Sequence, residues 1–155
     1  MDNIKISLAT GKDKQLLIKW FKFYSRRSAI LKRIECYTSH NFTVIAKDKK
    51  KIVGVLQWYA KEEPRHGLAE IEEVFVLDEY RGKGIGSRIV AFAIESVRDY
   101  FKKMKFNPRK IFLFVEKNNL SARHLYEKNG FKFVAEAGNL FDDGAIELFY
   151  VLNFN

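Results

Sequence analysis

Apolar and polar residues follow two different periods along this chain of 155 residues, and these periods predict both strands and helices. From Ile4 to Leu8 apolar residues alternate with polar ones, which predicts a short strand. Between residues 16 and 24 apolar residues recur at helical spacing with lysines on the other face, which predicts an amphipathic helix. Ser28 is placed to cap a second helix over the residues that follow it.

The rest of the chain alternates further strands with two more helices. Strands are expected at residues 42–46, 52–60, 68–77, 110–115, 131–137 and 145–154, and helices at 84–104 and 119–129. The run Lys47–Lys51 predicts a charged hairpin turn, and Asn107 with Pro108 ends the longer helix. Helices placed between strands predict a mixed sheet that is covered on both faces.

A glycine-rich turn joins the strand at 68–77 to the longer helix. An apolar strand that leads through glycines into a helix directs several backbone N–H groups at one spot, where the helix dipole favours an anion. Glycine also allows close backbone approach and positive φ. The turn holds Arg81, Gly82, Lys83, Gly84 and Gly86. The sequence therefore predicts a binding site for a phosphate-bearing group.

The glycine spacing excludes two common phosphate-binding motifs. A P-loop needs G-x-x-x-x-G-K-[ST], and the dinucleotide fingerprint needs G-x-G-x-x-G, whereas this chain has G-x-G-x-G from Gly82 to Gly86. With Arg81 in front, the pattern R-x-x-G-x-G resembles the acetyl-coenzyme A loop of the GNAT N-acetyltransferases.

A second segment supports this resemblance independently. Residues 119–131 are similar to the GNAT signature N-x-x-A-x-x-x-Y-E-K-x-G-F, and they follow the first motif after one helix and one strand. The order of expected elements is also that of the family. The resemblance therefore spans the chain and implies one domain, residues 1–155, of α/β (α+β) class. Its GNAT fold would have a mixed, mostly antiparallel sheet of about seven strands flanked by about four helices.

The resemblance also implies roles for particular residues. Asn119 would hydrogen-bond the pantetheine arm of the coenzyme, and the Tyr126 hydroxyl would lie near the thioester sulfur as a proton donor. Backbone groups of Phe75 and Val76 would pair with pantetheine and polarise the acetyl carbonyl. The pyrophosphate would be held by Arg81, Gly82, Lys83, Gly84, Ile85, Gly86 and Ser87.

Three carboxylates in the strand before the turn are candidates for a catalytic base. Glu70, Glu72 and Glu73 stand among residues that should otherwise be apolar, and the pair Glu72–Glu73 interrupts alternation in the manner of a β-bulge. Some GNAT enzymes use a carboxylate about four residues before the carbonyl-polarising amide, which favours Glu72 if Val76 supplies that amide. Glu73 stays open, and so does a role for these side chains in attracting a cationic substrate.

A sequence difference from one branch of the family limits the classes of acceptor substrate that are expected. Acetylases of ribosomal-protein N-termini often carry Leu-Glu-Val on the strand before the second motif, but this chain has Leu113-Phe114-Val115 and places Glu116 later. A primary amine of a small molecule is therefore favoured as acceptor, with acetyl-CoA as co-substrate. A protein N-terminus or lysine is the alternative. A non-catalytic CoA-binding or regulatory module is the rival of another class.

Composition and charge limit the remaining function classes. The chain is 47% hydrophobic, and its net charge of +9 lies in residues 1–51, which hold 13 basic and 4 acidic residues. No recognisable nucleic-acid module accompanies that charge, so nucleic acid is not expected as a partner. The single Cys36 and the absence of metal-like histidine spacing predict no disulfide and no metal. No apolar run matches a membrane span, a cytoplasmic protein is expected, and the sequence leaves a homodimer open.

Overall fold

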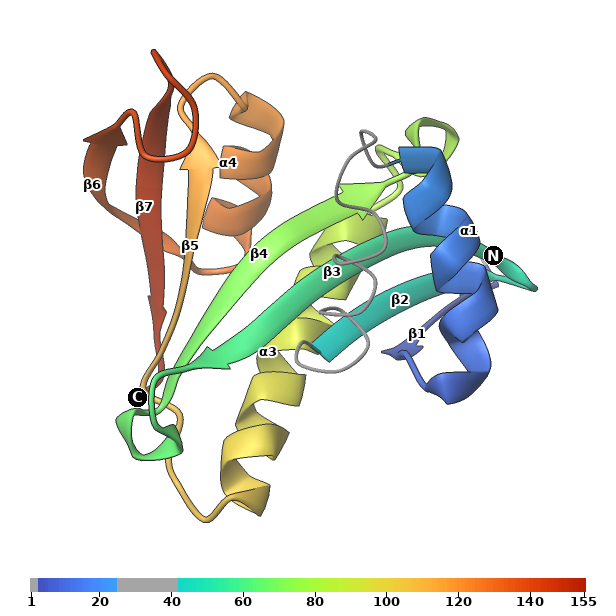
Figure 1. Ribbon diagram of the computed structural model, residues 1–155, viewed down its shortest axis with the longest axis horizontal. Coiled ribbons are helices and arrows are strands. Elements are labelled where there is room, and N and C mark those ends of the chain that lie inside the picture. Colours follow the sequence, from blue (N-terminus) through green and yellow to red (C-terminus); the bar gives the residue numbers. More distant parts are fainter. Residues whose placement is uncertain (1–2, 25–41) are drawn as a thin grey trace. The chain divides into compact units, whose positions relative to one another are not determined.

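The computed structural model describes residues 3–24 and 42–155 (Figure 1). The helix expected after Ser28 lies outside these residues, as does Cys36. The described strands and helices are β1 (Ile4–Leu8), α1 (Lys14–Tyr24), β2 (Phe42–Asp48), β3 (Lys51–Lys61), β4 (Leu68–Val76), α3 (Ile85–Lys103), β5 (Lys110–Glu116), α4 (Leu120–Lys128), β6 (Lys132–Gly138) and β7 (Ile146–Asn153).

The seven strands form one mixed sheet in the order β1-β2-β3-β4-β5-β7-β6. β4 and β5 are parallel, with Leu68–Glu70 in register with Lys110–Phe112. The pairs β1–β2, β2–β3, β5–β7 and β6–β7 are antiparallel. The expected mixed and mostly antiparallel sheet is therefore confirmed, and three α-helices accompany it within the described residues. None of those helices is long and apolar enough to cross a membrane.

The chain divides into two compact units, and the first comprises residues 1–59 with 73–93. In this unit α1 lies on one face of β2 and β3, and the first turns of α3 lie on the other (Figure 1). Trp20 of α1 is buried and meets the Phe75 ring of β4 edge to face, with centroids 5.7 Å apart. On the α3 face, Gly54 of β3 leaves room for the side chain of Ile89. The core of this unit is thus built on both faces of the strands.

The turn between β2 and β3 is shorter than the sequence predicts. Only Lys49 and Lys50 lie outside the strands, and Lys49 adopts a φ of 53°. Lys47 extends β2 because its ammonium group meets a carboxylate oxygen of Asp13 at 2.8 Å. Asp48 extends it further because it accepts a hydrogen bond of 2.9 Å from the Tyr80 hydroxyl. Partners beside the strand therefore keep these polar residues in extended conformation.

The second unit comprises residues 60–72 with 94–155 and contains β5, β7, β6 and α4. On one face of β7, the Tyr150 hydroxyl donates a hydrogen bond of 2.7 Å to Glu127 of α4. β6 carries a register shift between Phe133 and Ala135, which leaves Val134 as an extra residue. β6 is an edge strand of the sheet, and its residues are largely exposed.

Candidate functional site

The turn between β4 and α3 has the backbone conformation that its glycines predict. Gly82 and Gly84 adopt φ values of 73° and 74°, and a Cβ atom added to either would meet no atom of the described residues within 4 Å. Positive φ, rather than crowding, therefore makes glycine the favoured residue here. The turn leads into α3, where the N–H of Arg88 donates to the Gly84 carbonyl as the helix begins. The N–H groups of the first turn consequently point out of the helix N-terminus beside open space.

Charged side chains surround this turn, and most of them pair with one another. Arg81 meets Asp78 at 3.0 Å, and Lys51 meets Glu79 at 2.9 Å. The hydrogen bond from Lys51 lowers the pKa of Glu79 from its ordinary value. Lys83 lies over the ring of Tyr80, 5.2 Å from its centroid, and has no ion pair within the described residues. The ammonium group of Lys83 therefore remains available to an anion.

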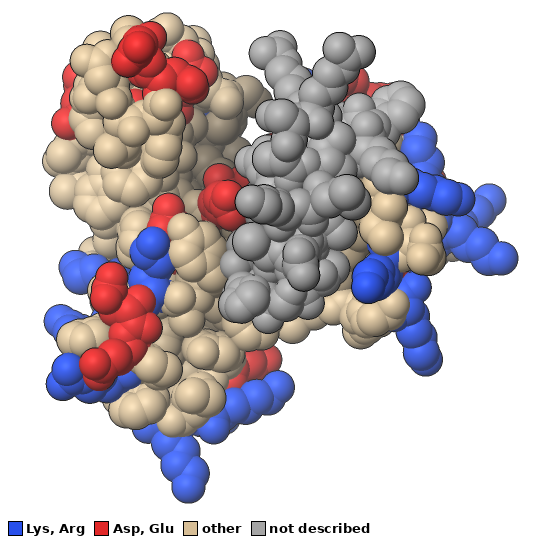
Figure 2. All heavy atoms as spheres, in the orientation of Figure 1, with Lys and Arg blue, Asp and Glu red and all other residues tan. Residues whose placement is uncertain are grey.

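Lysines also project along α1 and the β2–β3 turn of the same unit (Figure 2). Lys49, Lys50 and Lys51 are all exposed there. This matches the excess of positive charge in the first third of the sequence. The positive charge is spread over solvent-facing positions and would favour the approach of an anionic ligand.

A side-chain contact engages the end of β4, where the resemblance implies that backbone groups of Phe75 and Val76 pair with pantetheine. The Val76 carbonyl accepts a hydrogen bond of 3.0 Å from Nε of Arg81. The Val76 amide, which would polarise the acetyl carbonyl, is not part of this contact. The Arg81 guanidinium also lies 5.6 Å from the centre of the Phe75 ring. Arg81 therefore ties the turn to the end of the strand, a contact that sequence reasoning missed.

The three glutamates of β4 have different environments. Glu70 is largely buried and its carboxylate meets the Lys61 ammonium at 3.2 Å. Glu72 and Glu73 are both exposed although they are consecutive, while Ile71 before them is buried. The interrupted alternation predicted for this pair is therefore visible in the burial pattern. Glu73 lies in the first compact unit, and Glu72 in the second.

Residues of the second motif form the ends and the buried face of α4. The Asn119 carboxamide oxygen accepts from the N–H of Ala122 at 3.1 Å, so Asn119 caps the helix. Gly130 follows the helix with a φ of 92°. Tyr126 is 5% exposed and packs against Phe131, with ring centroids 5.7 Å apart. Each of these residues thus has a structural role beside the role that the resemblance implies.

A hydrogen-bonded group next to Tyr126 was not predicted from the sequence. Burial and then the hydrogen bond to Glu127 raise the pKa of Tyr150, while the hydrogen bond with Arg123 opposes this shift. The same hydrogen bond with Tyr150 raises the pKa of Arg123. The strand register places Tyr150 against α4, and this contact cannot be predicted from a local pattern. The only sequence signal for the network is Glu127, which belongs to the second motif.

The structure gathers the candidate residues into two groups. Phe75, Val76 and the turn from Arg81 to Ser87 lie in the first unit, and Glu72, Asn119 and Tyr126 lie in the second. Across the described ranges, no three His, Cys, Asp or Glu side chains gather as metal ligands would. The first group has what a bound diphosphate requires: open space at two glycines, a helix N-terminus and an unpaired lysine.

The sequence of this chain is similar to those of known acetyltransferases. The acetyltransferase (GNAT) family model matches residues 14–131. A spermine/spermidine N(1)-acetyltransferase of Bacillus subtilis is 28% identical over 75 residues, which are 48% of this chain and 46% of that protein. The match therefore spans less than half of that relative's length.

Solved structures share the fold. An acetyltransferase of the GNAT family from Streptococcus pneumoniae superposes with a TM-score of 0.77 at 20% identity, covering 99% of this chain and 100% of that one. Spermidine N-acetyltransferase from Vibrio cholerae, solved with CoA and spermine, gives a TM-score of 0.75 at 17% identity, covering 99% and 96%. With a family model that matches most of its length, this chain belongs to the acetyltransferase (GNAT) family.

Proposed function

We propose that this protein is an N-acetyltransferase that transfers the acetyl group of acetyl-CoA directly to a primary amine of a small molecule. The observation that carries the proposal is the turn between β4 and α3. Gly82 and Gly84 hold positive φ beside open space, and Lys83, which lies over the Tyr80 ring, supplies a positive charge that no ion pair within the described residues neutralises. These features fit the diphosphate of coenzyme A, with Arg81, Ile85, Gly86 and Ser87 completing the cradle.

The chemistry of the acceptor requires help with a proton. An alkyl amine with a pKa of about 10.4 is neutral in roughly one molecule in 10³ at pH 7. A nearby carboxylate can take the proton, and Glu72 and Glu73 in the middle of β4 are the candidates, with Glu72 favoured. Because both are exposed, either can exchange that proton with solvent.

Tyr126 is proposed to hold the proton that the leaving group receives. The bound acetyl thioester supplies the acyl group and a thiolate whose pKa is near 8.5 in the cysteine model, so the thiolate leaves without obligatory protonation. The Tyr126 hydroxyl therefore accelerates the reaction within the range of about 10²–10⁴-fold that is typical of general acids. Asn119 at the N-terminus of α4 is proposed to bind the pantetheine arm.

A small amine is the favoured acceptor for two reasons. The relative from Bacillus subtilis is named for spermine and spermidine, and the structure from Vibrio cholerae contains spermine. Phe114 also stands where one protein-acetylating branch has a glutamate, so this chain lacks that base. Acetylation of a protein N-terminus or lysine is the second candidate.

The test is acetyl-CoA consumption, followed as free thiol release, across a panel of acceptors. The panel contains spermidine, an aminoglycoside, free lysine and a peptide with an unblocked N-terminus. We expect release that depends on a small amine. Release with the peptide alone would replace the small-molecule acceptor by a protein. CoA binding without release for any amine would overturn catalysis and leave a coenzyme-binding module.

A further inference from the structure

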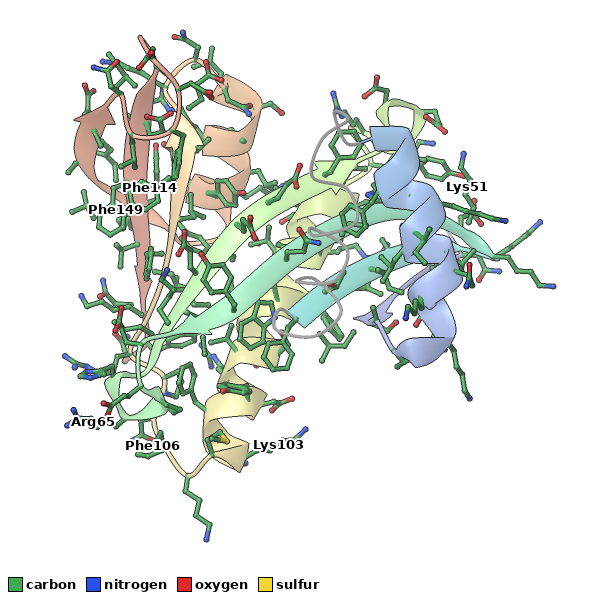
Figure 3. The ribbon with its side chains drawn as sticks, viewed as in Figure 1. Lys51, Arg65, Lys103, Phe106, Phe114 and Phe149 are labelled. Carbon is green, nitrogen blue, oxygen red and sulfur yellow. The ribbon has the colours of Figure 1, made fainter. Side chains whose placement is uncertain are left out.

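One face of β5 and β7 carries a group of aromatic rings. Phe114 and Phe149 are stacked, with centroids 5.1 Å apart and an interplanar angle of 30°, and they lie on adjacent strands (Figure 3). Phe112 meets Phe149 at 5.8 Å, and Phe141 of the β6–β7 connection meets Phe114 edge to face at 5.8 Å. Tyr150, by contrast, bonds to α4. The aromatic group therefore occupies the face of this unit that is opposite α4.

Two carboxylates share that face at one end of the aromatic group. Side chains two residues apart on a strand point the same way, so Glu147 shares the face of Phe149, and Glu116 shares that of Phe114. Glu116 and Glu147 are direct partners in the β5–β7 register. Their Cβ atoms consequently lie about 5 Å apart. The other face of the same strands has no equivalent carboxylate pair among the residues that β5 and β7 place opposite one another.

Within the described residues, the carboxylate of Glu147 has no positively charged partner, and one of its oxygen atoms has no hydrogen-bond partner. Glu147 is only 5% exposed, and its Oε2 atom is buried with no hydrogen-bond partner among residues 3–24 and 42–155. Neither Glu147 nor Glu116 forms an ion pair within the described part of the chain. Like charges directly opposite one another in a sheet are destabilising, and an unpaired buried carboxylate is costly. A bound cation would relieve both costs.

The surroundings favour an organic cation over a metal ion. A hard divalent metal ion needs about six oxygen ligands, which two carboxylates do not supply. A primary ammonium group has three N–H donors for carboxylate oxygens, and aromatic rings attract such a cation through their faces. Glu116 is exposed, so the pair is open to solvent on its side.

We propose that Glu147 and Glu116, flanked by Phe114 and Phe149, bind a protonated primary amine of a di- or polyamine. This inference rests on the proposed function, because the bound nitrogen is then the charged nitrogen of the acceptor that is not acetylated. The subsite makes an acceptor with two amines preferable to one with a single amine. The substrate class is therefore that of di- and polyamines. The residues that select it are Glu116 of β5 and Glu147 of β7.

Binding of spermidine to the full chain without coenzyme, measured by calorimetry, tests the subsite. Glu147→Gln should weaken binding at least about tenfold, because the carboxamide oxygen can still accept a hydrogen bond but carries no charge to attract the ammonium group. Glu116→Gln should weaken it less, because Glu116 is exposed. Glu136→Gln is the matched control, since Glu136 lies on β6 in an exposed ion pair with Lys117 and its loss should leave binding unchanged.

Two further readouts separate this inference from a purely structural role. Without ligand, Glu147→Gln should melt no lower than the parent, because it removes an unpaired carboxylate without changing side-chain shape. With acetyl-CoA, Glu147→Gln should raise the KM for spermidine and leave the KM for propylamine unchanged. If Glu147→Gln fails to fold, the exposed Glu116→Gln provides the same comparison.

The outcomes also separate the subsite from acetyl transfer. Thiol release by the parent, with the same spermidine affinity in Glu147→Gln and Glu116→Gln, would overturn the subsite and keep the proposed function. Spermidine binding that depends on Glu147 without thiol release would support the subsite and overturn the transfer. Binding of Mg²⁺ that displaces spermidine from the parent but not from Glu147→Gln would overturn the organic-cation assignment.

Discussion

The side chain of Arg81 donates a hydrogen bond of 3.0 Å from its Nε to the carbonyl oxygen of Val76. This contact fixes the end of β4 to the turn that precedes α3. The same guanidinium meets Asp78 and lies near the Phe75 ring, yet the side chain is 58% exposed. Arg81 therefore holds the local geometry while part of its charge stays accessible to a ligand.

Replacing Arg81 should affect ligand binding more than stability. Arg81→Ala should raise the Kd for CoA by about tenfold to 100-fold, the loss expected for one hydrogen bond to a charged group. Arg81→Lys should recover only part of the affinity, because an ammonium cannot bond the Val76 carbonyl in the same geometry. Calorimetric titration with CoA measures both. An unchanged Kd in Arg81→Ala would exclude Arg81 from the cradle.

A charge introduced at Gly84 should separate electrostatic from steric effects in the turn. Asp and Asn adopt positive φ more readily than most residues, so both variants should fold. Gly84→Asp should weaken CoA binding at least about tenfold more than Gly84→Asn, because the carboxylate opposes the diphosphate. Gly86→Asp in the first turn of α3 should act in the same direction.

The matched control for these glycine variants is Gly11→Asp. Within the part of the chain that the structure describes, a Cβ atom at Gly11 also meets nothing within 4 Å, and the φ of Gly11 lies outside the left-handed range. This variant adds the same charge to the same compact unit, away from the turn. Equal CoA affinity in Gly84→Asp and Gly11→Asp would contradict the cradle.

Loss of the Tyr126 hydroxyl should slow turnover without loosening the coenzyme. Tyr126→Phe keeps the ring that packs against Phe131, so the fold should be preserved. We expect kcat to fall by about 10²-fold, the lower end for a general acid, while the Kd for CoA stays within a factor of about two. Steady-state kinetics over the pH range of activity measure this. Parental turnover at every pH would remove Tyr126 from the chemistry.

Gly54 should be energetically coupled to Ile89 of α3. A Cβ atom at Gly54 would lie 2.6 Å from Cδ1 of Ile89 and 3.2 Å from the Phe75 carbonyl oxygen. Gly54→Ala should therefore destabilise the protein by about 1–3 kcal/mol, as overpacking does. Ile89→Val removes the Cδ1 atom that a Cβ atom at position 54 would contact. The double variant should therefore recover part of the lost free energy of unfolding. A double-mutant cycle by urea unfolding measures the coupling, and strict additivity would refute it.

Asp13 should make the stability of the protein sensitive to acid. Burial alone would raise its pKa, but hydrogen bonds from Lys47 and Thr10 outweigh burial and lower the pKa below its ordinary 3.8. A lowered pKa in the folded state contributes stability above the unfolded-state pKa, and that stability is lost as pH falls through the folded-state value. Urea unfolding between about pH 7 and pH 3 should show this loss in the parent and not in Asp13→Asn.

Sequence reasoning reached the local features of the fold and missed those that depend on strand register. The glycine turn at Gly82 and Gly84 and the short helix that follows Asn119 were predictable, because their signals lie within a few residues of each other. The hydrogen bond between Tyr150 and Glu127 joins residues 23 positions apart, and the pair Glu116 and Glu147 exists only in the β5–β7 register. No local pattern encodes either contact.

The hairpin turn between β2 and β3 also depends on contacts between residues that are distant in the sequence. The polar run from Lys47 to Lys51 was predicted as a loop, because charged residues usually lie outside strands. Asp13 and Tyr80 supply partners from distant parts of the sequence and keep β2 extended through Asp48. The assignment of Glu72 over Glu73 stays a prediction, because both are exposed.

Gly82 and Gly84 adopt the left-handed backbone conformation, so the chirality of a residue at these positions matters more than its size. At Gly82 and Gly84 an L-residue is strained although space is open around the Cα atom. D-alanine is the mirror case: it prefers positive φ, fills only that open space and reduces the freedom of the unfolded chain. By analogy with compatible glycine-to-alanine exchanges, it should stabilise the protein by about 0.4–1 kcal/mol. The methyl group of D-alanine would thus stabilise the turn without a ligand and would obstruct the binding of a diphosphate.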